Sequence, residues 1–407
     1  MKVFSPKILV VLILYCLLLA ACSGGGGSTF AGGGIDGTGI MSAGVVSAFG
    51  SIVVNGTEFD TRNATIIING EEVGMGDDAV LENLDIGMVV TVEGRISKDG
   101  TRVTADRVVY NDNVTGPVES VSAINPNEKE FMVLGQIVVV NYITKFKPDT
   151  FGFDSIAAND VVEVSGYLDD TGAIRATFIK KLGDASTILD YEVTGFVENL
   201  DANLKTFMVN GLGVNYSLIS NNLPPGMPAD DLFVEVGGRL SAGGELLAEK
   251  IELGDELVGE DGGQFEIMGY VTEIISDTDF IQFKVGSQVV QIDPEIVLFV
   301  DGAAGDIVPG VKLEAEGSLE GGILYADEIE FWKPDQIEVE GLVTNIVSAT
   351  EFYTGVQKVQ TDQYTLFDGG DWNDLALGVR IEVKGVPVDS NHSIIMADKV
   401  SFETEEF

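Results

Sequence analysis

The sequence contains one imidazole, the side chain of His392. Most nucleophilic and general acid–base sites depend on histidine, and zinc sites usually combine several histidine or cysteine ligands. His392 lies in a polar tip, Val388 to Ser393, between the last two segments with strand character. A single histidine in such a turn indicates neither a catalytic triad nor a zinc site. We therefore predict no catalytic residues, no cofactor and no enzyme activity.

Adjacent carboxylates are common, as expected of a chain with 65 acidic residues. Two carboxylates that face one sugar ring could perform glycosidase chemistry. The adjacent pairs Glu71-Glu72, Asp77-Asp78 and Asp230-Asp231 lie in segments with loop character, however. Nothing in the sequence brings two acids into a shared apolar pocket, so the pattern gives hydrolase activity little support.

Three short runs rich in oxygen ligands could contribute to a calcium site. They are Asn111-Asp112-Asn113, Asp169-Asp170-Thr171-Gly172 and Asp277-Thr278-Asp279. None has the twelve-residue loop with a bidentate glutamate that an EF-hand uses. The second run corresponds to a glycine-bearing tip that lacks acids elsewhere in the chain, as at Ser241-Ala242-Gly243-Gly244, so hairpin geometry explains it better. We predict no metal-ligating residues and keep calcium as an alternative partner.

The charge balance argues against several kinds of partner. The chain has 65 acidic and 23 basic residues, a formal net charge of -42. Such a surface repels phosphate backbones and anionic headgroups, so we do not expect nucleic acid as a partner. The simplest interpretation is a solvated acidic face that keeps the protein soluble. A divalent cation, a basic envelope protein or a glycan remains an alternative.

Residues 1–21 have the features of an export signal. Lys2 and Lys7 give a basic start, an apolar run follows from Ile8 to Leu19, and two small residues precede Cys22. The apolar run is shorter than the ~20 residues that a spanning helix needs. We therefore expect it to be removed rather than to span a membrane.

The sequence Leu19-Ala20-Ala21-Cys22 resembles the lipobox of bacterial lipoproteins. That resemblance implies that Cys22 is the lipid-attachment residue and that the membrane is a partner through this N-terminal anchor. Ser23, in place of Asp, implies an outer-membrane location, on the periplasmic face or the cell surface. Cys16 would leave with the leader and Cys22 would carry lipid, so neither a disulfide nor a thiolate site is expected.

A glycine-rich stretch follows the cysteine. From Ser23 to Gly39 the chain is nearly all Gly, Ser, Ala and Thr, which is typical of flexible coil. We interpret residues 22–40 as a tether. A phosphate-binding loop is the alternative, but no strand precedes the stretch and no Gly-Lys-Ser/Thr follows it.

One short segment recurs five times and organises the rest of the chain. It first appears at Leu84 to Gly94 as L-D-I-G-M-V-V-T-V-E-G, and later copies end at Gly166, Gly238, Gly317 and Gly385. The closing glycines lie 72, 72, 79 and 68 residues apart. A near-constant period of this size indicates internal duplication of a small domain.

Each copy contains signals for five strands. An opening strand carries a second glycine, and a hairpin follows, clearest at Ile52 to Gly56 with its Asn-Gly turn. A looser segment, such as Gly76 to Leu84 or Leu223 to Asp231, could hold one helical turn before the recurring strand. The last strand carries Ala-x-x-Ile/Val, as at Ala176 and Ile179. That spacing puts the two side chains on opposite faces, so we predict a bulge or a strand buried on both sides.

These signals predict an all-β fold of tandem small five-stranded OB-like Greek-key barrels, with small β-sandwich modules as the alternative. We place the modules at residues 41–111, 112–182, 189–254, 265–333 and 336–407. Linkers are expected at Gly183 to Thr187 and Gly254 to Gln264, with short junctions elsewhere, so that neighbouring modules stack. Outward positions of the recurring strand are mostly acidic, which discourages an analogy with barrels that bind nucleic acid.

With the repeats aligned, the chain resembles the domain of unknown function family numbered 5666, found in tandem in bacterial lipoproteins. The paired glycines, the Ala-x-x-Ile/Val close and the L-x-x-G-x-x-V-x-V-x-G pattern carry this resemblance across residues 43–403. Copies two and three have Asn159 and Asp230 near the turn glycine. The family implies no activity that could be transferred. We predict a non-catalytic cell-envelope lipoprotein that acts as spacer, adaptor or adhesion element, or alternatively a cation- or glycan-binding envelope protein.

Overall fold

The computed structural model describes residues 39–49, 51–97, 102–220, 223, 226–253, 263–277, 280–333, 336–388 and 394–402. The predicted export signal, the lipid-attachment residue Cys22, nearly all of the tether and His392 lie outside these residues. So do Thr278, Asp279 and most of the linker from Gly254 to Gln264.

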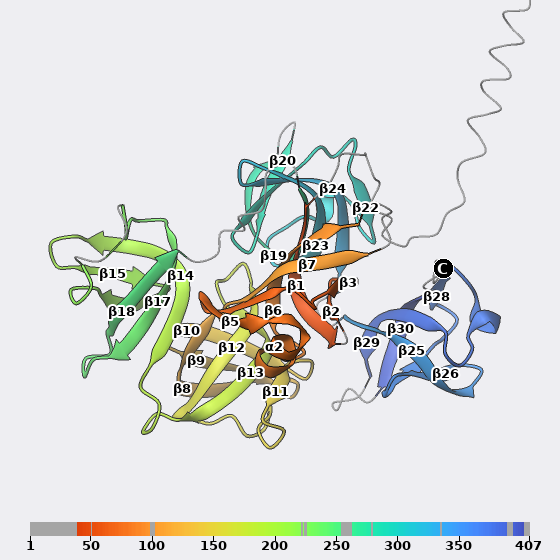
Figure 1. Cartoon of the computed structure of the whole chain (residues 1–407), viewed down its shortest axis with the longest axis horizontal. Helices are drawn as coiled ribbons and strands as arrows, with labels where there is room; N and C mark the ends of the chain where they lie inside the picture. Colours follow the sequence, from red (N-terminus) through yellow and green to blue (C-terminus); the bar gives the residue numbers. More distant parts are fainter. Residues whose placement is uncertain are drawn as a thin grey trace, which may run out of the picture.

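Strands follow one another along the whole described chain and are grouped in five modules (Figure 1). Module 1 contains β1 (Gly39–Phe49), β2 (Ile52–Val54), β3 (Thr57–Asp60), β4 (Thr65–Ile68), β5 (Glu71–Met75), the helix α2 (Gly76–Asn83), β6 (Val89–Ile96) and β7 (Val103–Tyr110). Module 2 contains β8 (Val114–Asn125), β9 (Glu128–Val133), β10 (Gln136–Asn141), β11 (Lys145–Lys147), β12 (Asp160–Leu168) and β13 (Ile174–Asp184). Module 3 contains β14 (Tyr191–Asp201), β15 (Thr206–Val209), β16 (Leu212–Asn215), β17 (Phe233–Leu240) and β18 (Leu246–Leu253).

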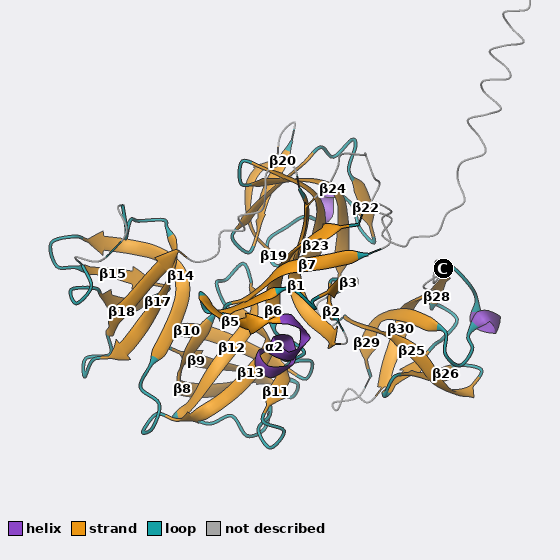
Figure 2. Cartoon of the chain, in the orientation of Figure 1, coloured by secondary structure: helices purple, strands orange, loops and turns teal. Residues whose placement is uncertain are grey.

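The last two modules repeat this order. Module 4 contains β19 (Gln264–Asp277), β20 (Ile281–Val285), β21 (Gln288–Ile292), β22 (Leu298–Val300), the turn η1 (Ala304–Asp306), β23 (Lys312–Glu320) and β24 (Ile323–Trp332). Module 5 contains β25 (Ile337–Ser348), β26 (Glu351–Thr354), β27 (Gln357–Gln360), β28 (Leu366–Asp368), the turn η2 (Trp372–Asp374), β29 (Arg380–Pro387) and β30 (Ile394–Phe402). In the described chain helix is confined to α2 and the two short turns (Figure 2).

Every module has the same strand topology. In module 2, β8 pairs antiparallel with β9 and β12, β9 pairs with β10, β10 runs parallel to β13, and β13 returns beside β12. The same five pairings occur in module 1, module 3, module 4 and module 5. This closed path is the OB-type Greek-key barrel, so the predicted fold class is confirmed.

The predicted bulge lies in the last strand of every module, between the alanine and the Ile/Val. In module 2, Ser165 pairs with Phe178 and Gly166 with Ala176, which leaves Thr177 as the extra residue. Ala176 and Ile179 can therefore both enter the core, where they are 6% and 0% exposed. The bulge presses the backbone against the closing glycine: a Cβ on Gly166 would come 2.3 Å from the Arg175 carbonyl oxygen. This contact explains why each recurring strand ends in glycine.

The turn before the recurring strand requires a left-handed backbone. Its φ is +101° at Gly87, +86° at Gly310 and +85° at Gly378, and the copies without glycine use Asn159 at +72° and Asp231 at +66°. Asn and Asp tolerate this conformation better than other residues with a side chain. The departures in copies two and three therefore keep the turn geometry, with Asp231 rather than Asp230 in the strained position.

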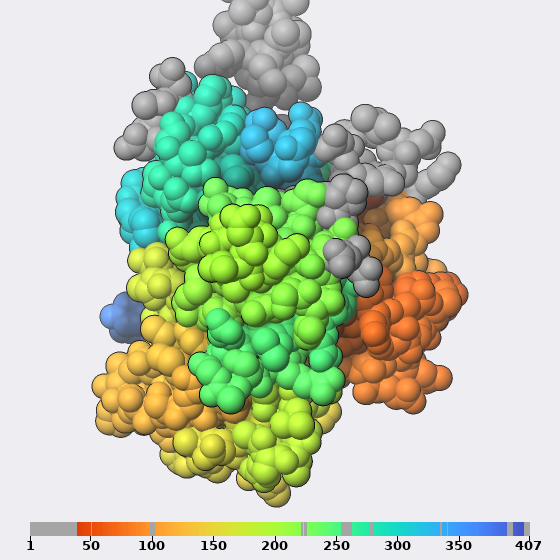
Figure 3. All heavy atoms as spheres, turned by 90° about the vertical axis from the view of Figure 1, so that its left-hand side faces the viewer, coloured from red at the N-terminus to blue at the C-terminus, as the bar shows by residue number. Residues whose placement is uncertain are grey.

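The modules also pair with one another. β1 runs parallel to β19, with Ile40–Ala43 beside Gln264–Ile267, and joins modules 1 and 4 in a 13-stranded sheet. β8 pairs with β14 and joins modules 2 and 3 in an 11-stranded sheet, while module 5 keeps its own six strands. Figure 1 shows modules 3 and 5 on opposite sides of the others, and Figure 3 shows modules 1, 2 and 4 around module 3. Stacking of chain neighbours alone does not describe this assembly, because module 1 shares a sheet with module 4.

In modules 1, 2, 4 and 5 the segment before the recurring strand places an apolar side chain in the core. Leu84, Ile156, Ile307 and Leu375 are all buried in the core of their own module. In module 1 the looser segment is the helix α2, as expected for Gly76 to Leu84, whereas the described residues between Leu223 and Asp231 form turns. No helix in the described part of the chain has the length and apolar character needed to cross a bilayer.

Candidate functional site

Modules 3, 4 and 5 carry a pair of glutamates at equivalent positions. In each module one glutamate lies on the first strand, three residues before its glycine, and the other on the recurring strand, three residues before the closing glycine. We call them the carboxyl pairs: Glu192 with Glu235, Glu266 with Glu314, and Glu338 with Glu382. Glu235 is 4% exposed and Glu266 is 9% exposed. The interpretation of outward acids as a solvated face is wrong at Glu235 and Glu266, because both are buried.

Burial raises the pKa of four of the six glutamates in the carboxyl pairs. It raises the pKa of Glu192 to about 10, and a hydrogen bond with Glu235 adds to the effect. It raises the pKa of Glu266 to about 7, and it holds the pKa of Glu314 and of Glu338 well above the ordinary range. Two carboxyl groups can share a hydrogen bond only if one of them keeps its proton. The pairs in modules 3 and 4 therefore retain protons at neutral pH.

Module 1 contacts all three carboxyl pairs. Asn69 Nδ2 donates to Glu192 Oε2 at 3.0 Å, and Ser42 Oγ donates to Glu266 Oε2 at 3.0 Å. Gly56 lies beside the third pair, since a Cβ there would be 3.5 Å from Glu338 Oε1. Module 1 is therefore the hub against which modules 3, 4 and 5 place their buried acids.

The first oxygen-rich run, Asn111-Asp112-Asn113, lies at a module junction and not at a loop tip. Asp112 is 1% exposed and accepts hydrogen bonds from Thr115 Oγ1 at 2.6 Å and Asn69 Nδ2 at 2.7 Å. Burial and the nearby Glu163 raise the pKa of Asp112 to about 7. These contacts join modules 1 and 2, and Thr194 Oγ1 of module 3 donates to the Asp112 backbone carbonyl at 3.2 Å.

The second oxygen-rich run forms a hairpin turn, as predicted. Asp169 accepts from the Thr171 backbone N–H at 2.9 Å and from Thr171 Oγ1 at 2.6 Å, and its other oxygen pairs with Arg175 Nε at 2.8 Å. Its oxygens are thus used within the tip. In the part of the chain that the structure describes, no group of three His, Cys, Asp or Glu side chains could hold a metal ion.

The adjacent acids named in the sequence do not form a shared site. Glu71 and Glu72 are exposed on β5, and Asp77 in α2 accepts from Thr61 Oγ1 at 2.7 Å. Asp230 accepts from the Leu200 backbone N–H at 2.9 Å. Each of these acids therefore either hydrogen-bonds within its own module or is exposed to solvent.

Modules 1, 2, 4 and 5 meet around a small aromatic cluster. Tyr167 and Met268 pack with Trp332, and all three are buried. Two ammonium groups lie over the Trp332 ring, Lys312 at 4.9 Å and Lys384 at 4.6 Å from its centroid. The two ammonium groups differ in how many carboxylates lie within 4.0 Å.

Lys384 is held by glutamates. Its Nζ lies 2.9 Å from Glu330, 3.6 Å from Glu338 and 3.8 Å from Glu382. Burial alone would lower the pKa of Lys384, but these carboxylates together raise it. The cluster fastens module 5, which contributes Glu338, Glu382 and Lys384, to Glu330 of module 4.

Lys312 has no such partner. Among the described residues no carboxylate oxygen lies within 4.0 Å of its Nζ, which lies over the ring of Trp332 and 6.0 Å from that of Tyr167, while Glu314 and Glu338 act on it from farther away. Burial lowers the pKa of Lys312 to about 8. An enclosed ammonium without a counter-ion is costly, so this residue marks the junction as a candidate site.

A cavity of about 550 Å³, here called the junction cavity, opens beside these residues. Its lining comes from module 1 (Val45, Ile86), module 2 (Lys145, Phe146), module 4 (Lys312, Trp332) and module 5 (Ile337, Val339), among others. A second cavity of about 400 Å³ shares Lys312 and Tyr142 with it.

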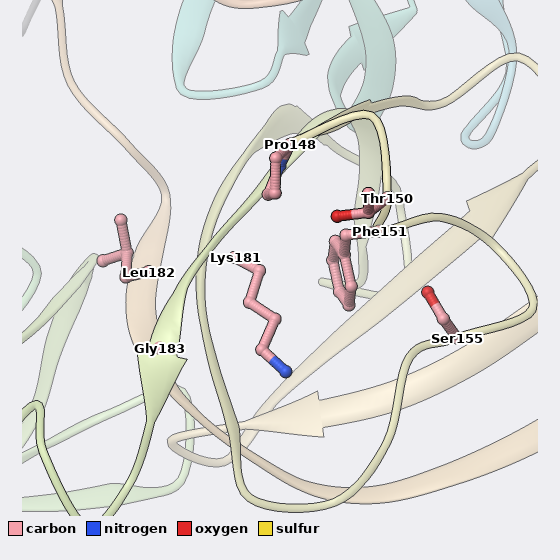
Figure 4. Close-up of a pocket in the computed structure, with 7 residues that line it drawn as sticks. All are labelled: Pro148, Thr150, Phe151, Ser155, Lys181, Leu182 and Gly183. Atoms are coloured by element: carbon pink, nitrogen blue, oxygen red, sulfur yellow. The ribbon is translucent and has the colours of Figure 1, made fainter.

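Another cavity, of about 410 Å³, lies within module 2 (Figure 4). Lys181 extends into the space between Pro148 and Ser155. Its ammonium pairs with Asp160 and lies 3.6 Å from Asp184, and Ser155 Oγ accepts from the Gly152 backbone N–H at 2.8 Å. Because these polar groups already have partners, this cavity offers little to a ligand.

Sequence reasoning missed both the carboxyl pairs and Lys312. The pairs do leave a signal, since Glu-x-x-Gly occurs on both the first and the recurring strand of modules 3, 4 and 5. Lys312 leaves none, because its isolation depends on which side chains of three other modules surround it.

A comparison with protein-family models finds one family that matches most of the chain. The profile described as Domain of unknown function (DUF5666) matches in tandem over residues 38–109, 115–180, 194–252, 268–330 and 340–400. A search among curated proteins finds no match. A solved structure named "drosophila Unr CSD456" is 14% identical over 52% of this chain and 97% of that chain, with a TM-score of 0.14. A multidomain protein with nucleic acid binding domains from Streptococcus pneumoniae is 11% identical over 55% and 73%, also with a TM-score of 0.14. At these TM-scores neither similarity carries an argument about this chain.

Proposed function

The chain belongs to the family described as Domain of unknown function (DUF5666), and from its five docked copies we propose that it is a non-catalytic cell-envelope lipoprotein. Its modules act as a spacer, adaptor or adhesion element, held to the outer membrane by lipid on Cys22. The leader at residues 1–21 and the glycine-rich stretch that follows Cys22 support the anchor.

The single observation that carries this proposal is how the outward face of the first and recurring strands is used. In modules 3, 4 and 5 that face holds the carboxyl pairs, and these pack against module 1. A face committed to docking between modules is not available for a substrate. The geometry therefore supports a structural assembly of packed barrels rather than a set of independent binding domains.

The same geometry favours an adaptor over an extended spacer. Modules 1, 2, 4 and 5 line one cavity, and β1 pairs with a strand more than two hundred residues away. A block of this kind presents several loop tips at fixed relative positions. Such an arrangement suits simultaneous contact with more than one envelope component.

The lipid anchor is tested by the Cys22→Ser variant. We expect the unaltered chain, expressed in a bacterial host with an outer membrane, to incorporate an alkyne-tagged palmitate and to fractionate with that membrane. The Cys22→Ser variant lacks the acceptor thiol and should lose both the label and the membrane association. Cys16→Ser, which changes the leader only, is the matched control and should keep both. Persistent lipid label in Cys22→Ser would refute the anchor.

A further inference from the structure

Lys312 differs from Lys384, the other lysine over the Trp332 ring, in forming no ion pair within 4.0 Å among the described residues, although Glu314 and Glu338 act on it from farther away. Lys384, over the same Trp332 ring, has three glutamates within 4 Å. Lys312 has none among the described residues, although the chain carries 65 acidic side chains. A buried ammonium is stabilised by an anion or by several hydrogen-bond acceptors. Its position in the wall of the junction cavity leaves room for such a group to come from outside the chain.

Two further donors line the same cavity. Lys145 on β11, which is exposed to solvent, also has no carboxylate within 4.0 Å in the described part of the chain. The indole Nε1 of Trp332, a residue that is 6% exposed, has no hydrogen-bond acceptor among the residues that the structure describes. Buried donors are rarely left without acceptors, and an unpaired one calls for an explanation. The unpaired indole N–H and Lys312 therefore point to a missing acceptor, and Lys145 adds a second ammonium group to the same cavity lining.

The remaining wall is largely apolar. Val45, Ile86, Phe146, Ile337 and Val339 all line the cavity. The volume of about 550 Å³ falls within the range of small-molecule sites, which combine apolar walls with a few placed polar groups. A ligand that fits this wall has an apolar body.

We propose that the junction cavity binds an organic anion, with an apolar body and one carboxylate or phosphate group that contacts Lys312, Lys145 and the Trp332 indole N–H. Such a ligand would contact four modules at once. The inference is independent of the lipid anchor and of the adaptor role.

Other ligand classes fit this cavity less well. A metal cation would meet two ammonium groups. A sugar ring would stack on Trp332, but that ring already contacts Lys312 and Lys384. Glu338 also lines the cavity, but its carboxylate lies 3.6 Å from Lys384 Nζ and pairs with that ammonium.

The test compares four probes whose alkyl chains have seven or eight carbons and whose head groups differ. Octanoate, octyl phosphate, octanol and octyltrimethylammonium are titrated into the mature five-module chain, without lipid, by isothermal calorimetry. We expect at least one of the two anions to bind about tenfold or more tightly than the alcohol and the cation. Neither octanol nor octyltrimethylammonium can form the charge-assisted hydrogen bond that an anionic head group forms with a lysine ammonium. Octanoate against octyl phosphate distinguishes the two head groups. Equal binding of all four probes, or none, would overturn the proposal.

Matched variants locate the site. Lys312→Met should weaken the anion about tenfold or more, whereas Lys205→Met should not, although Lys205 likewise lies over an aromatic ring, that of Tyr216 at 5.9 Å in module 3. Trp332→Phe keeps a ring and removes only the N–H, and should weaken the anion several-fold. Affinity should also fall as pH rises through about 8, where Lys312 loses its charge. Melting curves show that each variant is folded, and unchanged affinity in both folded junction variants would contradict the assignment.

Discussion

The smallest residues of this protein occupy its tightest backbone contacts. At the five closing glycines a Cβ would lie between 2.0 and 2.4 Å from a carbonyl oxygen of the last strand. The opening glycines are crowded by side chains instead, as where Asn55 Oδ1 would lie 1.8 Å from a Cβ on Gly44. The two glycines of each module are therefore required because atoms pack closely against the backbone at two places in each barrel.

Gly166→Ala is expected to destabilise module 2. The added methyl group would meet the Arg175 carbonyl oxygen at 2.3 Å, so the bulge must move, at a cost of about 1–3 kcal/mol. Urea denaturation measures the loss. Gly152→Ala, in the same module, is the control, because nothing lies within 4 Å of its Cβ and its φ is not left-handed. Equal losses in the two variants would show that the bulge does not set the requirement.

At the scale of strands, the barrels pack against one another through desolvated carboxyl groups. The first and recurring strands of modules 3, 4 and 5 present the carboxyl pairs to module 1, and Asp112 of module 2 joins the same contacts. Carboxyl groups in such places favour the protonated form. Docking between modules is therefore linked to pH.

The folded chain should lose stability as pH rises from acid to alkaline. An acid whose pKa is raised by folding stabilises the folded state fully below its unfolded pKa, and this contribution is lost as pH rises through the folded pKa. Glu266 shifts from 4.5 to about 7, and Glu192 from 4.5 to about 10. We expect the melting temperature to fall between pH 4.5 and 7 and to fall further toward pH 10. A melting temperature that rises over this range would contradict the assignment.

Repulsion among the many surface acids would also lower stability at high pH, so charge-matched variants are needed. The triple variant Glu192→Gln, Glu266→Gln and Glu338→Gln should show a shallower dependence on pH. The exposed triple variant Glu72→Gln, Glu198→Gln and Glu320→Gln removes the same charge and should keep the slope of the unaltered chain. If both triple variants flatten the slope equally, the carboxyl pairs are not its cause.

At the scale of the whole molecule, module 1 organises the other four. It shares a sheet with module 4, donates to acids of modules 3 and 4, and contacts module 2 where the Val89 backbone N–H donates to Ser165 Oγ at 2.9 Å. Module 5 is fastened mainly through Lys384 and the glutamates around it, together with Lys333 and Asp398 at 2.7 Å. The assembly thus has one strongly shared centre and a less extensive attachment of module 5.

Lys384→Met should release module 5. Removing the ammonium leaves Glu330, Glu338 and Glu382 enclosed without their cation, and breaking a buried ion pair in this way costs about 3–5 kcal/mol. Small-angle scattering should then report a larger radius of gyration and maximum dimension. Lys399→Met, which breaks a pair with Asp368 inside module 5, is the control and should leave both unchanged. An unaltered scattering profile for a folded Lys384→Met would place the attachment elsewhere.

The sequence by itself determined the module and its internal geometry. The period of the closing glycines, the alternation of apolar residues and the Ala-x-x-Ile/Val spacing predicted tandem five-stranded barrels and the bulge of the last strand. These features depend on backbone conformation and on side chains only a few positions apart, which a linear pattern records.

Only the tertiary structure decided how the modules meet. The pairing of β1 with β19, the burial of Glu235 and Glu266 and the isolation of Lys312 all depend on residues from different modules. The sequence shows the same glutamate whether it faces water or another barrel, so its interpretation as a solvated acid was reasonable and wrong. Burial is a property of the assembled surfaces: it places both acids between modules and raises the pKa of Glu266 to about 7.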